Sequence, residues 1–334
     1  MSQDNDQLLK DYLRLEKKLK EIYQKGGIED FHDKEIGSAK DILKNCSSVH
    51  HYIPKYFNDG FLDDDGLMFV YDKQQDRIKL NKQGSKGVFF EINRNNVDLG
   101  LESPVSIMEQ AYAVFDRLIP ASIKLLRSDI ELAAAMRIDL HAHLNIFIID
   151  LYWRNINNDH LFDALYDLAD LTMTGPDGPI NLSADEMEYF KQVPFMKQLM
   201  RFKMVAKTLE AITNPENGDR VFATQTITFP LKQLCIGDMP YLFKNKPVTM
   251  DDLLNVPMFF PLSSHKLYLR NVNLEEQIAL RETNMFNALV IHQSSKMICA
   301  ADKKILESAI AYYHSAKALN LFDYFKNCLF NSPM

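Results

Sequence analysis

The strongest constraint on the fold is a long segment in the middle of the chain, from Ser128 to Trp153. Ser128 and Glu131 match the Ser-x-x-Glu pattern of a capping box, which opens a helix. The apolar stretch inside the segment, Ile138 to Trp153, contains two Asp and two His residues and is shorter than the roughly 20 apolar residues of a membrane span. The segment therefore predicts a long helix of a globular core and no membrane crossing.

The sequence around this segment also has helical patterns. Ser103 and Pro104 suit the first positions of a helix, and an apolar stripe follows them. A shorter helix is expected at 161–171, closed by the Gly- and Pro-rich loop 175–179, and Ser183 with Glu186 forms a second capping box that opens a helix through about Ile212. Residues 103–212 therefore predict a helical bundle.

Strand patterns dominate on both sides of the helical region. Runs rich in β-branched and aromatic residues, bounded by turn residues such as Asp, Asn and Gly, are typical of strands. They predict strands at 67–71 and 88–90 before the bundle, strands at 221–229, 234–236, 258–262, 266–272 and 288–292 after it, a helix at 276–284 and a C-terminal helix at 301–325. Strands gathered at both ends of a helical middle indicate an α+β fold with a central helical bundle flanked by short strands.

Two regions are expected along the chain. Residues 1–45 hold an apolar stripe from Leu8 to Ile22 at helical spacing and then a loop, whereas residues 46–330 form a single α+β domain, helical at 103–212 and strand-rich at 218–292. The N-terminal helix either docks on its own domain or forms a homodimer contact through Leu15 and Leu19.

Composition limits the classes of function. Among 334 residues, 46% are apolar and 25% charged, which is the balance of a globular protein. The net charge of −7 argues against a protein that coats nucleic acid, although a local basic groove remains possible on that count. The four cysteines lie far apart, without the paired spacing of zinc or redox motifs, and the polar start lacks a secretory pattern. We therefore expect a cytoplasmic protein without a membrane segment.

Familiar catalytic motifs are missing or poorly placed. The sequence has no Gly-rich nucleotide loop and no Gly-x-Ser-x-Gly elbow, so the cofactor, if there is one, stays unknown. His141 and His143 resemble the His-x-His metal motif of the amidohydrolase superfamily, which lies at the end of a strand. On the helix predicted here, positions two apart diverge by about 200°, so we assign no metal ligand.

The segment His50-His51-Tyr52-Ile53-Pro54 is the better candidate for chemistry. Two histidines and a tyrosine beside a conformationally restricted proline concentrate groups that act as acid, base and hydrogen-bond donor. The alternative is that the histidines hold a loop through hydrogen bonds.

This segment is also the first of two motifs that the chain shares with a bacterial family of unknown function, marked by His-His-Tyr-(Val/Ile)-Pro and a late Ser-Asp-x-Pro. Residues 237–240, Gly-Asp-Met-Pro, resemble the second motif with Gly237 where serine is usual, and Asn58-Asp59-Gly60 replaces a more apolar stretch. Tyr152-Trp153-Arg154-Asn155 resembles the Arg-containing helix end of that family. The resemblance covers about residues 48–315 and implies no reaction.

Taken as one site, these positions carry the chemistry of phosphate esters. The sequence predicts His50, His51 and Asp238 as catalytic residues and Tyr52, Arg154 and Asn155 as binding residues. The function that follows is a hydrolase or nuclease-like enzyme acting on a phosphodiester, such as nucleic acid or another phosphate-bearing substrate, in a defence setting. The alternatives are a non-catalytic ligand- or protein-binding module, and a buried Arg154–Asp238 ion pair that closes the bundle onto the strands.

Overall fold

The computed structural model describes most of the chain from residue 48 onward. The described residues are 48–96, 112, 116, 119–130, 134–168, 173–175, 178–180, 182–193, 196–198, 200–201, 204–205, 223–247, 250–272 and 282–331. The predicted N-terminal helix and its homodimer contact lie outside them. Most of the helix predicted at 276–284 also lies outside them, as does most of the helix predicted after Ser103, of which residues 112 and 116 are described.

Strands and helices both contribute to the described fold. The strands are β1 (Val49–His51), β2 (Phe69–Asp72), β3 (Arg77–Ile78), β4 (Phe90–Ile92), β5 (Met173–Gly175), β6 (Gly178–Ile180), β7 (Thr224–Thr228), β8 (Ile236–Gly237), β9 (Leu242–Phe243), β10 (Met258–Ser263), β11 (Lys266–Arg270) and β12 (Met297–Ala300). The helices are α4 (Lys55–Asn58), α6 (Pro120–Arg127), α7 (Ala134–Arg154), α8 (Asp159–Leu168), α9 (Ala184–Gln192), α11 (Met250–Asn255), α13 (Thr283–Gln293), α14 (Lys303–Ala318) and α15 (Phe322–Phe330).

The strands form two four-stranded sheets and two small ribbons. The orders are β7-β11-β10-β9 and β3-β2-β12-β8 for the sheets, and β1-β4 and β5-β6 for the ribbons. Every pairing among the described strands is antiparallel. Antiparallel sheets combined with separately grouped helices make the fold α+β, as predicted.

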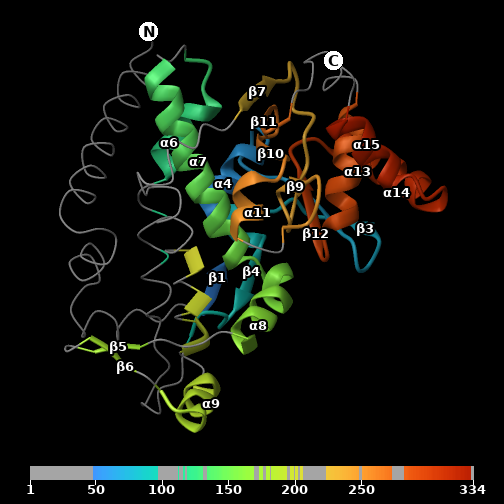
Figure 1. Cartoon of the computed structure of the whole chain (residues 1–334). Coiled ribbons are helices and arrows are strands. Elements are labelled where there is room, and N and C mark those ends of the chain that lie inside the picture. The colour runs from blue at the N-terminus through green and yellow to red at the C-terminus, as the bar shows by residue number, and fades with distance from the viewer. Residues whose placement is uncertain are drawn as a thin grey trace.

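Both faces of the β7-β11-β10-β9 sheet are buried along its central strands β10 and β11, whereas the edge strand β7 is partly exposed. Side chains alternate between faces along a strand: Phe260 of β10 and Tyr268 of β11 join the core that contains α6 and α7, whereas Phe259 and Leu269 join the core of α13, α14 and α15. Figure 1 shows α7 and α13 on opposite sides of these strands. The sheet thus lies between two helical layers, an arrangement that differs from the expected bundle flanked by strands.

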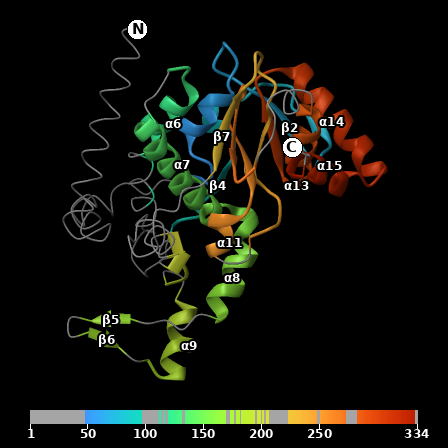
Figure 2. The ribbon, with the colours of Figure 1, turned by 45° about the horizontal axis from the view of Figure 1, so that its top comes forward.

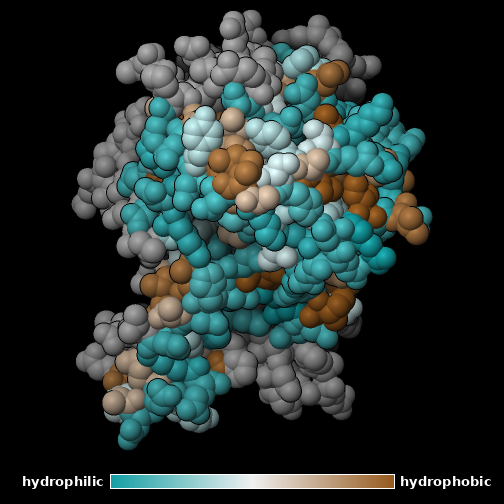
Figure 3. Space-filling model, turned by 90° about the vertical axis from the view of Figure 1, so that its right-hand side faces the viewer, coloured by the Kyte–Doolittle hydropathy of each residue, from teal (hydrophilic) through white to brown (hydrophobic). Residues whose placement is uncertain are grey.

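The next features are a projecting segment, the polarity of one surface and the apolarity of the helices. The β5-β6 ribbon and α9 project away from the layered body (Figure 2). On the side of the C-terminal helices hydrophilic residues predominate and apolar ones form separate spots (Figure 3), which is normal for a protein surface. Among the described residues, none of the helices combines the length and apolarity that crossing a membrane would require.

Several local predictions are confirmed. Residues 138–153 lie in α7, residues 161–168 lie in α8, and the predicted strands at 67–71 and 258–262 overlap β2 and β10. The second capping box is present: the Glu186 carboxylate accepts from the backbone N–H and the hydroxyl of Ser183, each at 2.8 Å. Ser128 has a different role, because its hydroxyl donates to the Leu125 carbonyl at 2.7 Å and the residue ends α6.

Two predictions in the C-terminal half are wrong. The strand expected at 288–292 is part of helix α13. The residues from Ala288 to Ile291 are all apolar and all buried, and such a run has no period that separates helix from strand. The single helix expected at 301–325 is two helices, α14 and α15, separated at Asn320, whose φ of 52° is the left-handed conformation that ends helices. The sequence prediction also missed strand β12.

The helix predicted from Ser183 to Ile212 is interrupted near Pro194. Helix α9 stops at Gln192, two residues before that proline, because a proline disfavours helical dihedrals in the residue that precedes it. The described residues 196–198, 200–201 and 204–205 are again helical, as predicted. The single domain expected over 46–330 stays a prediction.

Candidate functional site

His50 lies in the two-stranded β1-β4 ribbon, opposite Glu91. Its side chain is completely buried. The Nδ1 atom accepts a hydrogen bond from the backbone N–H of Asn95 at 2.9 Å, which fixes the loop that follows β4. A ring nitrogen used in this way holds a loop, as the second interpretation of the histidine pair predicts.

His51 points the opposite way. Consecutive residues of a strand face opposite sides, and the side chain of His51 is half-buried rather than enclosed. Its Nε2 atom lies 3.3 Å from the Lys86 carbonyl oxygen, and its ring is tilted against Phe90 at 5.7 Å between centroids. The two histidines therefore occupy separate environments.

Tyr52 belongs to the hydrophobic core. Its backbone N–H donates to the Phe89 carbonyl at 3.0 Å, and its ring meets that of Phe89 edge-on at 6.3 Å. Burial, together with the negative charge of Asp238, raises the pKa of Tyr52 well above its ordinary value. The phenol is thus protonated and enclosed at neutral pH.

Arg154 ends α7 in a cluster of two carboxylates. Its Nη1 and Nη2 atoms donate to the two oxygens of Asp116 at 3.0 and 3.2 Å, and Nη1 lies 3.4 Å from Asp150 one turn earlier on the helix. The guanidinium lies over the ring of Tyr112, 4.7 Å from its centroid. These contacts fix the direction of a nearly buried positive charge.

Asn155 continues the chain beyond α7 and joins it to the β8 region. Its Nδ2 atom donates to the backbone carbonyl of Asp238 at 2.6 Å, and its Oδ1 atom accepts from the N–H of Asn157 at 2.9 Å. Because the side chain is fully buried, its observed contacts are those of a structural connector.

The Asp238 carboxylate accepts hydrogen bonds from the turn that leads into β12. One oxygen accepts from the N–H of Ser295 at 2.8 Å. The other accepts from the Ser295 hydroxyl at 3.0 Å and from the N–H groups of Lys296 at 2.6 Å and Met297 at 3.3 Å. The residue is completely buried. The Asp238 carboxylate therefore accepts its hydrogen bonds from the turn, whereas the guanidinium of Arg154 pairs with Asp116 and Asp150. The Arg154–Asp238 ion pair considered from the sequence is not among these pairs.

Gly237 is required beside Ser294. A Cβ atom at position 237 would lie 1.9 Å from the Oγ atom of Ser294 and 3.2 Å from its Cβ atom. That hydroxyl donates to the Val290 carbonyl at 2.7 Å, and Ser294 is the residue that caps the C-terminal end of α13. The serine that is usual at this position in the resembling family would not fit here next to Ser294.

One cleft brings together two of the six predicted residues. His51 and Arg154 line a hollow of about 440 Å³, which we call the His51–Arg154 cleft. His50, Tyr52, Asn155 and Asp238 do not line it. The other polar residues of the cleft are Lys55, Tyr56, Asp59 and Asp116.

Sequence reasoning missed these four residues. Lys55, Tyr56 and Asp59 follow the histidine pair within one short helix and its continuation, so their proximity was available as a signal. Asp116 lies 38 positions before Arg154, and no local pattern relates the two residues.

Tyr56 brings a buried hydroxyl to this region. No described residue forms a hydrogen bond with the hydroxyl oxygen. Burial and the charges of Asp116 and Asp150 raise the pKa of Tyr56 well above its ordinary value, so the hydroxyl keeps its proton and remains a donor.

His141 and His143 do not form a metal pair. Both lie on α7, and their Nδ1 atoms meet different partners: the Thr224 hydroxyl at 2.6 Å for His141 and the Ser122 hydroxyl at 2.9 Å for His143. Within the described part of the chain no three His, Cys, Asp or Glu side chains form a group suited to a metal ion. The His-x-His resemblance to amidohydrolases therefore carries no function.

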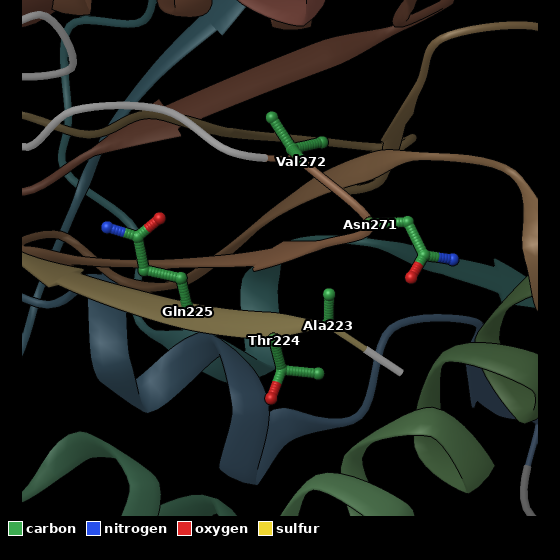
Figure 4. A pocket seen from close by; sticks show the side chains of 5 residues that line it. All are labelled: Ala223, Thr224, Gln225, Asn271 and Val272. Atoms are coloured by element: carbon green, nitrogen blue, oxygen red, sulfur yellow. The ribbon is translucent and has the colours of Figure 1, made fainter. Parts of the chain in front are cut away.

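A second hollow, of about 730 Å³, lies at the end of β7 and β11. Figure 4 shows its lining side chains, among them Thr224, Gln225 and Asn271, pointing in different directions. None of the described residues that line it is ionisable, whereas the described lining of the His51–Arg154 cleft has five ionisable side chains besides that of Tyr56.

Comparison with known proteins identifies a family. Residues 49–304, which are more than half of the chain, match the family described as "Protein of unknown function (DUF4238)". No curated protein and no solved structure matches the chain. The chain therefore belongs to the DUF4238 family, in agreement with the predicted membership of a family of unknown function.

Proposed function

We propose that this protein binds a small phosphate-bearing ligand in the His51–Arg154 cleft. The observation that carries the proposal is that three nitrogen-bearing side chains from three separate elements, His51 of β1, Lys55 of α4 and Arg154 of α7, line one hollow. A volume of about 440 Å³ is in the range of sites for small molecules.

The chemistry of these side chains fits a phosphate group. A guanidinium presents paired N–H donors that match two phosphate oxygens, and a lysine ammonium adds a mobile point charge. The buried carboxylate of Asp150 lies 3.4 Å from the guanidinium of Arg154, so the orientation of the guanidinium is fixed before a ligand binds. Lys55 is exposed at the start of α4 and is placed to approach from the solvent side.

The binding proposal is tested by replacing Lys55 with glutamine. We expect titration calorimetry with inorganic phosphate to give an affinity about five- to tenfold weaker for Lys55→Gln than for the unchanged protein, because removing one partly solvated charge costs about 1 kcal/mol. Lys124→Gln is the matched control: Lys124 is also an exposed helical lysine, but it lies outside the cleft. The proposal would be contradicted if the unchanged protein bound no phosphate. It would also be contradicted if the two variants weakened phosphate affinity equally.

Hydrolysis of a phosphodiester is the second candidate function. It is favoured by one observation, that His51 shares the cleft with the carboxylates of Asp59 and Asp116. A histidine and carboxylates around one phosphate are the groups that general acid–base catalysis of hydrolysis uses. This candidate does not include Asp238, whose carboxylate is bound by the turn before β12.

The hydrolysis candidate predicts a selective loss in His51→Gln. We expect turnover of bis(p-nitrophenyl) phosphate, assayed with and without divalent cations, to fall by about 100-fold or more, because general acid–base catalysis contributes factors of that size. The thermal midpoint should stay within a few degrees, since His51 is half-buried, its Nε2 atom lies as far as 3.3 Å from the Lys86 carbonyl oxygen, and glutamine keeps a polar group at the position. Absence of turnover by the unchanged protein under all conditions would leave binding alone as the function.

A further inference from the structure

The two carboxylates that hold Arg154 are unequal. Asp150 is completely buried, lies on the same helix and approaches one guanidinium nitrogen at 3.4 Å. Asp116 has 31% of its side chain exposed, lines the His51–Arg154 cleft and is hydrogen-bonded through both oxygens, at 3.0 and 3.2 Å. Asp150 is thus a fixed support of the guanidinium, whereas Asp116 occupies the side that faces the cleft.

We propose that Asp116 is an internal competitor of the ligand, whose carboxylate occupies the two guanidinium N–H groups of Arg154 that a phosphate would otherwise bind. The inference rests on the proposed function and adds a residue that sets the affinity of the cleft. A carboxylate and a phosphate present two oxygens to a guanidinium in the same side-by-side geometry, so one can replace the other without movement of Arg154.

The charges of the cleft support this exchange. While Asp116 is bound, two described cations, Lys55 and Arg154, face three carboxylates: Asp59 and Asp116 in the lining of the cleft, and Asp150 behind the guanidinium. An entering anion then meets no net positive charge. When the Asp116 side chain turns to solvent, the guanidinium regains donors for the ligand, and the partly exposed position of Asp116 makes that turn possible.

The exchange also selects among ligands. A weakly charged ligand gains less from the guanidinium than Asp116 loses when it leaves, whereas a phosphate monoester with nearly two negative charges gains more. Asp116 thereby favours strongly anionic ligands over neutral or singly charged ones of the same size.

The experiment compares the removal of one paired negative charge inside the cleft with the same change outside it. We expect Asp116→Asn to bind inorganic phosphate about tenfold more tightly than the unchanged protein, whereas Asp163→Asn changes the affinity by less than about threefold. Asp163 is the matched control because it is also a partly exposed carboxylate in an ion pair, with Lys197 at 2.7 Å, but it does not line the cleft.

Each outcome bears on the inference alone. An unchanged affinity in Asp116→Asn, or an equal gain in Asp163→Asn, overturns the role of Asp116 and leaves the phosphate site standing, because binding by the unchanged protein and its weakening in Lys55→Gln are measured separately. Circular dichroism confirms that the variants are folded. Asp116→Ser, which also lacks the carboxylate, is the second variant if the asparagine protein is unstable, and it should show the same gain.

Discussion

Replacing Gly60 with alanine is expected to lower the free energy of unfolding by about 3–5 kcal/mol, the range seen when a buried charge loses its partners. The new Cβ atom would lie 2.5 Å from the Cζ atom of Arg127. That guanidinium donates to the carbonyls of Tyr56 at 3.1 Å and of Phe57 and Leu262 at 2.6 Å each. It therefore has little freedom to move away.

The charge of Arg127 makes the displacement costly. Burial lowers the pKa of Arg127 to about 10, which still leaves the group charged at neutral pH, so displacing it strands a charge away from its acceptors. Urea denaturation measures the loss. Gly84→Ala is the control, since a Cβ atom there meets its nearest neighbours at 3.9 Å, and we expect a change within about 1 kcal/mol. Equal stability of the two variants would contradict this account of Gly60.

Asp238→Asn is expected to destabilise the protein by a similar amount, about 3–5 kcal/mol. One accepting carboxylate oxygen becomes an NH₂ group, which would face N–H or O–H donors that it cannot accept from. The affected turn joins α13 to β12, and Asp238 serves it with four hydrogen bonds. Thermal and urea unfolding measure the loss, and phosphate affinity of the folded variant should be unchanged.

The same variant tests the catalytic role that the sequence predicted for Asp238. Lost turnover with unchanged stability would refute the structural role and support the catalytic one. The control is Asp323→Asn, which makes the same chemical change on an exposed residue of α15, where we expect an effect within about 0.5 kcal/mol.

Local signals in the sequence predicted much of the secondary structure. The Ser183–Glu186 capping box, the turn-bounded strand at 67–71 and the long helix ending near Trp153 each depend on residues close together in the chain, and each is present. Signals of this kind fail where burial is complete, as in α13, because an all-apolar run has no periodicity. They also fail for sheet order, which depends on contacts between distant strands.

The sequence prediction included two of the residues that line the His51–Arg154 cleft, His51 and Arg154. One histidine of the motif at 50–54, His51, lines the His51–Arg154 cleft. The two histidines separate because they alternate on a short strand that the sequence prediction did not include. Arg154 was found through its family resemblance, whereas its partner Asp116 lies 38 residues away with no local pattern. Asp238 was grouped with the site through the resemblance of residues 237–240 to the second family motif, and its carboxylate accepts hydrogen bonds from the turn at Ser295.

The most direct test of the account is a crystal structure of the protein soaked with inorganic phosphate. We expect a phosphate between His51, Lys55 and Arg154, with the side chain of Asp116 turned away from the guanidinium. A cleft that stays empty at saturating phosphate, with the Arg154–Asp116 pair intact, would contradict it.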